Sequence, residues 1–94
     1  MILEQLCNAR GVSGDERVVR ELILESIVDA VDEHRVDALG NLICLKRAHN
    51  SRQQLKVMVA AHMDEIGLII TGINSDGTLR FGKVGGIDDR VLLS

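Results

Sequence analysis

Aromatic residues are nearly absent from the sequence: Phe81 is the only one among 94 residues, and tryptophan, tyrosine and proline do not occur. Modules that stack nucleobases need several exposed aromatic side chains, so this class of nucleic-acid binder is excluded. Positive charge is also scarce, because 11 lysines and arginines face 14 acidic residues and the net charge is −3. A protein that binds nucleic-acid phosphates needs a basic face, and we therefore expect no nucleic-acid partner.

Long apolar runs and cysteine pairs are missing as well. No run approaches the roughly 20 apolar residues that cross a bilayer, and the N-terminus lacks the basic start and apolar stretch of a signal peptide. These absences predict a cytoplasmic protein with no membrane partner. Cys7 and Cys44 stand far apart and form no C-x-x-C pattern, which predicts two small buried thiols in a reducing compartment.

Aliphatic residues are plentiful instead. Hydrophobic residues make up 46% and charged residues 27% of the sequence, as in a typical soluble globular protein. A chain of this size buries only about 60–65% of the surface that its unfolded form exposes, so its stability margin is thin. The sequence ends inside an apolar run at 91–93. Because exposed apolar strands invite aggregation, we expect Ser94 to be a cut rather than the edge of a domain.

Two helices are predicted near the N-terminus. Apolar residues share one face over residues 2–9, and Gly11 then breaks the pattern. Residues 13–16 (SGDE) form a capping-box pattern, in which the Ser13 hydroxyl accepts from the Glu16 N–H and the Glu16 carboxylate reaches back. A second helix is predicted over residues 14–30 because apolar residues recur at three and four positions. The buried stripe of this helix is Val19, Leu22, Ile23, Ile27 and Val31.

Strands are predicted further along the chain from alternation, short apolar runs and turn signals. They are residues 34–37, 41–46, 56–61, 65–73 and 78–83, with another strand beginning at 91–93. The almost wholly apolar run at 56–61 predicts a strand buried on both faces, and the polar residues 48–54 predict a loop. Residues 74–77 form a turn with Gly77 placed for a positive φ. Two helices followed by a mixed set of strands define an α/β fold class.

The sharpest chemical feature is the segment 60–67, AAHMDEIG. His62 follows a predicted buried strand, where open α/β sheets place their ligand-binding groups. Residues i and i+2 of an extended chain point the same way, so His62 and Asp64 share one face while Glu65 projects to the other. A metal-bound imidazole usually has its second ring nitrogen held by a carboxylate. The pattern therefore favours His62 as a metal ligand with Asp64 as its partner.

Other interpretations of these residues stay open on the pattern alone. H-x-D arises often by chance, and a single histidine near a strand end is more often an ordinary core or surface residue than a ligand. Asp64 and Glu65 on opposite faces do not flank one glycosidic bond, which disfavours a glycosidase pair. His34 and His49 are expected to be solvated, and a helix cap fully explains Ser13.

Several blocks together resemble a known family. They are residues 11–16 (GVSGDE), 37–42 (DALGNL), 61–67 (AHMDEIG), 77–81 (GTLRF) and 84–88 (VGGID), in the family's order and covering essentially the whole chain. In these blocks the chain resembles the N-terminal portion of the tetrahedral (TET-type) glutamyl aminopeptidases, metallopeptidases of which some carry an endoglucanase name.

The resemblance implies a site and a reaction. It implies that His62 binds one of two divalent ions, zinc or cobalt, and that Asp64 is a catalytic residue that orients this histidine. The other ligands of that family lie further along a longer chain, so the 94 residues alone are expected to be inactive. The reaction implied is removal of N-terminal residues from peptide substrates, with the two ions activating a bridging water.

The resemblance also implies an organisation. Residues 1–67 would be the N-terminal part of a catalytic α/β domain, and residues 68–94 would begin an inserted, β-rich dimerisation domain. The implied assembly is a homo-oligomer built from dimers, up to a dodecamer. Two alternatives from other classes are a non-catalytic oligomerisation module and, with less support, a glycoside hydrolase.

Overall fold

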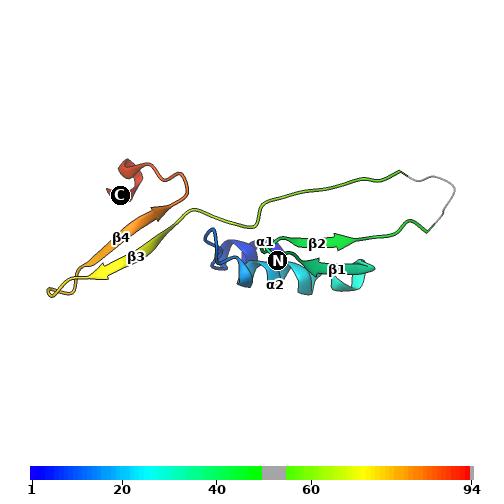
Figure 1. Ribbon diagram of the computed structural model, residues 1–94, viewed down its shortest axis with the longest axis horizontal. Coiled ribbons are helices and arrows are strands. Elements are labelled where there is room, and N and C mark those ends of the chain that lie inside the picture. The colour runs from blue at the N-terminus through cyan, green and yellow to red at the C-terminus, as the bar shows by residue number, and fades with distance from the viewer. Residues whose placement is uncertain (50–54, 94) are drawn as a thin grey trace.

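The computed structural model describes residues 1–49 and 55–93. The elements are α1 (Ile2–Asn8), α2 (Arg17–Ile27), the 3-10 turn η1 (Val28–Ala30), β1 (Glu33–Val36), β2 (Leu42–Leu45), β3 (Gly67–Ile73), β4 (Leu79–Val84) and the 3-10 turn η2 (Asp89–Leu93). The molecule is elongated, with extents of 67 × 29 × 23 Å. Figure 1 shows the helices and the β1–β2 hairpin in one half, and the β3–β4 hairpin extending away in the other.

Both predicted helices are present, and their positions confirm the apolar stripe in part. Val19 is buried on α2, whereas Leu22, Ile23 and Ile27 are half-buried. The second helix begins at Arg17 rather than at 14. Gly14 explains the late start, because its φ of 94° is a left-handed conformation that a right-handed helix cannot contain.

The predicted capping box is wrong. Glu16 occupies the N-cap position of α2, and none of the described side chains makes a capping hydrogen bond there. The Glu16 carboxylate instead accepts from the Gly14 N–H at 2.6 Å. The Ser13 hydroxyl donates to Asp64 Oδ2 at 2.5 Å. A hydrogen bond to an ionised carboxylate is stronger than one between neutral groups, which explains why this hydroxyl faces Asp64 and not the helix.

The two hairpins follow their local sequence signals. β1 pairs antiparallel with β2 from Glu33↔Leu45 to Val36↔Leu42. Its turn is held by Asp37, whose carboxylate accepts from the backbone N–H groups of Leu39 and Asn41 and from the Asn41 side chain. These bonds, that of the Asn41 side chain first, hold the pKa of Asp37 below its ordinary value.

β3 pairs antiparallel with β4 from Gly67↔Val84 to Ile73↔Leu79, with a bulge between Ile70 and Gly72. The predicted turn is confirmed, since Gly77 has a φ of 86°. The four strands predicted at 34–37, 41–46, 65–73 and 78–83 are all present with ends that differ by one or two residues.

Two predicted strands are wrong. Residues 56–61 form no strand and are exposed, with 90% of Met58 and of Val59 accessible. A strand needs a hydrogen-bonded neighbour, and no described segment pairs with this one. Residues 91–93 lie in η2, because the Val91 N–H donates to the Asp88 carbonyl and turns the chain. The predicted loop at 48–54 lies mostly outside the described residues.

The core of the described part is small. Val19 and Ile87 are its only buried hydrophobic side chains, and many large apolar side chains are exposed. Cys7 is exposed and Cys44 half-buried, both as free thiols, so the predicted burial is wrong for Cys7. None of the described helices is long and apolar enough to cross a membrane.

Candidate metal-binding site around His62 and Asp64

The site is built where two segments distant in sequence lie side by side. Val12 and Glu65 form a parallel β-bridge, and the Glu65 N–H donates to the Gly11 carbonyl at 2.7 Å. The close approach requires glycine at position 11, because a Cβ there would lie 2.6 Å from Val19 Cγ2 and 3.3 Å from the Met63 carbonyl oxygen. The blocks GVSGDE and AHMDEIG therefore meet in space and hold the 62–65 segment against the start of α2.

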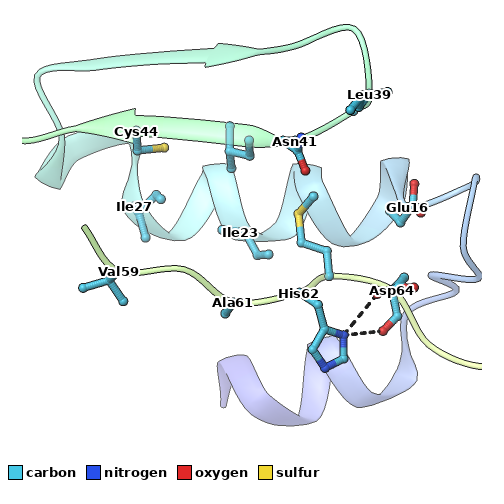
Figure 2. Close-up of a pocket in the computed structure, with 13 residues that line it drawn as sticks. Glu16, Ile23, Ile27, Leu39, Asn41, Cys44, Val59, Ala61, His62 and Asp64 are labelled. Atoms are coloured by element: carbon cyan, nitrogen blue, oxygen red, sulfur yellow. Dashed lines mark hydrogen bonds and ion pairs between the residues drawn. The ribbon is translucent and has the colours of Figure 1, made fainter.

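His62 turns its ring back onto Asp64. Nδ1 lies 2.9 Å from the Asp64 carbonyl oxygen and 3.1 Å from Asp64 Oδ1, as the dashed lines in Figure 2 show. Both oxygens are acceptors, so Nδ1 is the donor in this contact. The ring is 84% exposed. Of the two neutral tautomers of His62, the contact therefore favours the one in which Nε2 is accessible and can accept.

The Asp64 carboxylate is held at both oxygens. Oδ1 faces His62 Nδ1, and Oδ2 accepts the Ser13 hydroxyl at 2.5 Å. The bond from Ser13 first, and that from His62 after it, hold the pKa of Asp64 below its ordinary value. Asp64 is therefore ionised at neutral pH, and a carboxylate beside an imidazole N–H raises the basicity of the other ring nitrogen.

The other candidate residues either lie on other elements than His62 or use their side chains in other contacts. Glu65 uses its carboxylate to accept the Gly11 N–H at 3.3 Å. His34 on β1 and His49 after β2 are exposed, as expected. Among residues 1–49 and 55–93, no group of three His, Cys, Asp or Glu side chains is placed to hold a metal ion. The described donor set therefore fits one imidazole ligand and its orienting carboxylate, and not a complete metal site.

An open cleft of about 410 Å³ runs along this segment. α2 forms its floor, β2 one wall and residues 59–64 the other, as Figure 2 shows. The lining mixes apolar side chains, among them Ile23, Ile27 and Val59, with polar residues, which are Glu16, Asn41, His62 and Asp64.

Sequence reasoning missed Ser13. Its hydroxyl meets a carboxylate 51 positions away, and a local pattern carries no information on such a contact. The one usable signal is that GVSGDE and AHMDEIG are both among the blocks that carry the family resemblance.

Histidines that bind metal ions usually have their second ring nitrogen held in this way by a carboxylate or a carbonyl. Residues 40–94 match the M42 glutamyl aminopeptidase family. This match covers more than half of the chain, and the chain belongs to that family.

Individual relatives agree with this assignment. A lysyl aminopeptidase of Pyrococcus furiosus is 39% identical over 94 residues, which are 99% of this chain and 26% of the relative. The structure of an endoglucanase from Thermotoga maritima has a TM-score of 0.85 at 47% identity. The match covers 96% of this chain and 28% of the endoglucanase chain. The structure of the PhTET1-12s dodecamer has a TM-score of 0.79 at 46% identity, and the match covers 97% of this chain and 26% of the PhTET1-12s chain.

The chain spans about a quarter of the length of these relatives. Their similarity confirms the resemblance to the TET-type aminopeptidases and the α/β fold class, with the chain matching an N-terminal portion.

Proposed function

We propose that the chain forms part of the active site of a metallo-aminopeptidase that removes N-terminal residues from peptides. The family assignment supports a peptidase, and the names of relatives, which include lysyl and glutamyl aminopeptidases, support the attack on N-terminal residues. The observation that carries the proposal is the contact of His62 Nδ1 with Asp64, which leaves Nε2 free.

In this proposal His62 ligates a divalent ion through Nε2, and Asp64 is the catalytic carboxylate that orients the ring. When bound, a pair of zinc or cobalt ions supplies polarisation of the scissile carbonyl and a water nucleophile at neutral pH. Asp64 keeps the Nδ1 proton in place and compensates the positive charge that builds up on a ligating imidazole. Its low pKa keeps it ionised for this task throughout the neutral range.

The described residues supply too few ligands to act alone. A catalytic zinc takes about three protein ligands and a water, whereas one histidine is available here. We therefore expect the isolated 94 residues to lack peptidase activity and to bind zinc weakly. The remaining ligands must come from residues outside those described.

We also propose that the chain contributes to two domains. Residues 1–67 belong to the catalytic domain, and residues 68–94 form the start of a dimerisation domain. The separation of the β3–β4 hairpin from the helices supports this division (Figure 1). The hairpin exposes large apolar side chains, among them Ile70 at 52% and Phe81 at 48%. Together with the dodecameric form of one similar structure, this exposure supports a homo-oligomer.

A glycoside hydrolase is the weaker alternative, although one similar structure carries the name endoglucanase. Such enzymes need two carboxylates that flank one bond. Asp64 is instead engaged with Ser13 and His62, and Glu65 with Gly11. A non-catalytic interaction module would use only the exposed apolar surface, and it would not explain the contact between His62 and Asp64.

The test uses the complete gene product with zinc or cobalt, and lysyl, glutamyl and leucyl p-nitroanilides as substrates. We expect release of p-nitroaniline by the wild type and by the control His34→Ala, which alters an equally exposed histidine. His62→Ala should lower the rate at least about 100-fold. Undiminished activity of His62→Ala, or hydrolysis of carboxymethylcellulose without any release of p-nitroaniline, would contradict the proposal.

A further inference from the structure

We propose that Ser13 is a positioning residue for the metal ligand His62 and acts through Asp64. The inference rests on the proposed function, because it takes His62 as the ligand. It adds a side-chain role to the GVSGDE segment, whose backbone already pairs with Glu65. The contacts that carry it run in one line, from Ser13 Oγ to Asp64 Oδ2 and from Asp64 Oδ1 to His62 Nδ1.

The bond from Ser13 restricts the orientation of the Asp64 carboxylate. Asp64 is 43% exposed, and an exposed aspartate samples a broad range of χ2 angles. With His62 as its only partner, the carboxylate and the ring would turn together. The bond from Ser13 fixes the second oxygen, so the plane of the carboxylate and the direction in which it presents Oδ1 are both set.

The Ser13 hydroxyl can restrict Asp64 only if the backbone around Ser13 is itself held in place. Residue 13 follows the parallel bridge between Val12 and Glu65. The Asp15 N–H donates to the Val12 carbonyl at 2.8 Å, which closes a turn around Ser13. The left-handed φ of Gly14, 94°, completes that turn. The backbone on both sides of Ser13 is therefore held, and its hydroxyl is aimed at Asp64.

The fold does not depend on Ser13 for a helix cap or for core packing. Ser13 makes no described capping bond to α2, and its side chain is exposed. Removing the hydroxyl therefore takes no cap from the helix and leaves no buried cavity. A hydroxyl that neither caps nor packs has Asp64 as its one described partner.

The experiment measures zinc affinity in the complete gene product by competition with a chromophoric chelator. The variants are Ser13→Ala, which removes the hydroxyl, and Ser13→Thr, which keeps it. The matched control is Ser26→Ala, because the exposed Ser26 hydroxyl donates to the Leu22 carbonyl at 2.8 Å and is remote from the site in sequence.

We expect Ser13→Ala to weaken zinc binding about 10-fold, the low end for loss of an outer-sphere partner. Ser13→Thr and Ser26→Ala should bind as the wild type does. In the metal-free protein labelled with ¹⁵N-histidine, Ser13→Ala should also shift the Nδ1 and Nε2 resonances of His62 toward an average of the two tautomers. Thermal unfolding followed by circular dichroism should show all three variants folded.

Wild-type affinity and unchanged ¹⁵N resonances in Ser13→Ala would overturn the inference. His62→Ala separates this failure from that of the proposed function. If His62→Ala loses zinc while the Ser13 variants keep it, only the role of Ser13 is wrong. If His62→Ala keeps full zinc affinity, His62 is not a ligand and both proposals are wrong.

Discussion

Gly11 and Glu65 are joined by hydrogen bonds in both directions. The Glu65 N–H donates to the Gly11 carbonyl at 2.7 Å, and the Gly11 N–H donates to Glu65 Oε1 at 3.3 Å. The two segments run parallel at Val12 and Glu65, and the turn that follows Val12 brings the Ser13 hydroxyl to Asp64. The relationship between two backbone segments thus determines which side chains meet at the candidate site.

Gly11→Ala is expected to destabilise this junction. The new Cβ would lie 2.6 Å from Val19 Cγ2 and 3.3 Å from the Met63 carbonyl oxygen, and relief of such overlap typically costs about 1–3 kcal/mol. Urea denaturation of the complete gene product measures the loss. Gly86→Ala is the matched control, because no described atom lies within 4 Å of its Cβ position. Equal stability of the two variants would show that the segments do not approach so closely.

Asp64→Asn is expected to lower aminopeptidase activity about 10- to 100-fold, the range for loss of a partner that orients a metal-bound histidine. The amide keeps the shape of the side chain and removes the charge that faces Nδ1. The control is Asp76→Asn, because Asp76 accepts bonds from Thr78 in the β3–β4 turn, at the far tip of the hairpin. Equal rates for the two variants at saturating zinc would remove Asp64 from the mechanism.

Acid should weaken the bond between Ser13 and Asp64 in a defined direction. The pKa of Asp64 is lowered in the folded protein, chiefly by this bond. A lowered folded-state pKa contributes stability above the ordinary aspartate pKa of about 3.9, and this contribution disappears as pH falls through the folded-state value.

The comparison is between the metal-free wild type and Ser13→Ala, followed by urea denaturation from pH 7 to pH 3. We expect the wild type to be the more stable of the two at pH 7, and the difference to shrink as the pH drops below about 4. A difference that stays constant over this range would mean that the Ser13 hydroxyl does not stabilise the ionised carboxylate.

Phe81→Asp is expected to disrupt self-association of the complete gene product. Phe81 stands opposite Ile70 in the hairpin register, and both side chains are about half exposed, so a carboxylate would enter an apolar face. Ser75→Asp adds the same charge at the hairpin turn and serves as the control. Light scattering coupled to size-exclusion chromatography should show smaller species for Phe81→Asp only, and unchanged mass for both would contradict the role of this face.

Local patterns were sufficient for the two helices and the two hairpins, although not for the capping box at residues 13–16. Spacing predicted the helices, and Gly77 with its turn predicted the β3–β4 hairpin. The run at 56–61 was predicted as a buried strand because its residues are apolar, but strand formation depends on a neighbour that the described residues do not provide.

The same contrast between local patterns and contacts of distant residues applies to the candidate site. The i, i+2 spacing predicted that His62 and Asp64 lie on one face, and their contact agrees with it. The role of Ser13 was mistaken for a helix cap because its partner is 51 positions away. Short patterns therefore located the pair, and only the three-dimensional arrangement revealed what holds it.

The most direct test of the account is a crystal structure of the complete gene product grown with zinc, with anomalous data collected at the zinc edge. The account predicts an anomalous peak about 2.0–2.1 Å from His62 Nε2, with Nδ1 still bonded to Asp64. A zinc-loaded, active crystal in which His62 has no ion, or in which its ring is turned so that Nδ1 faces the metal, would contradict it.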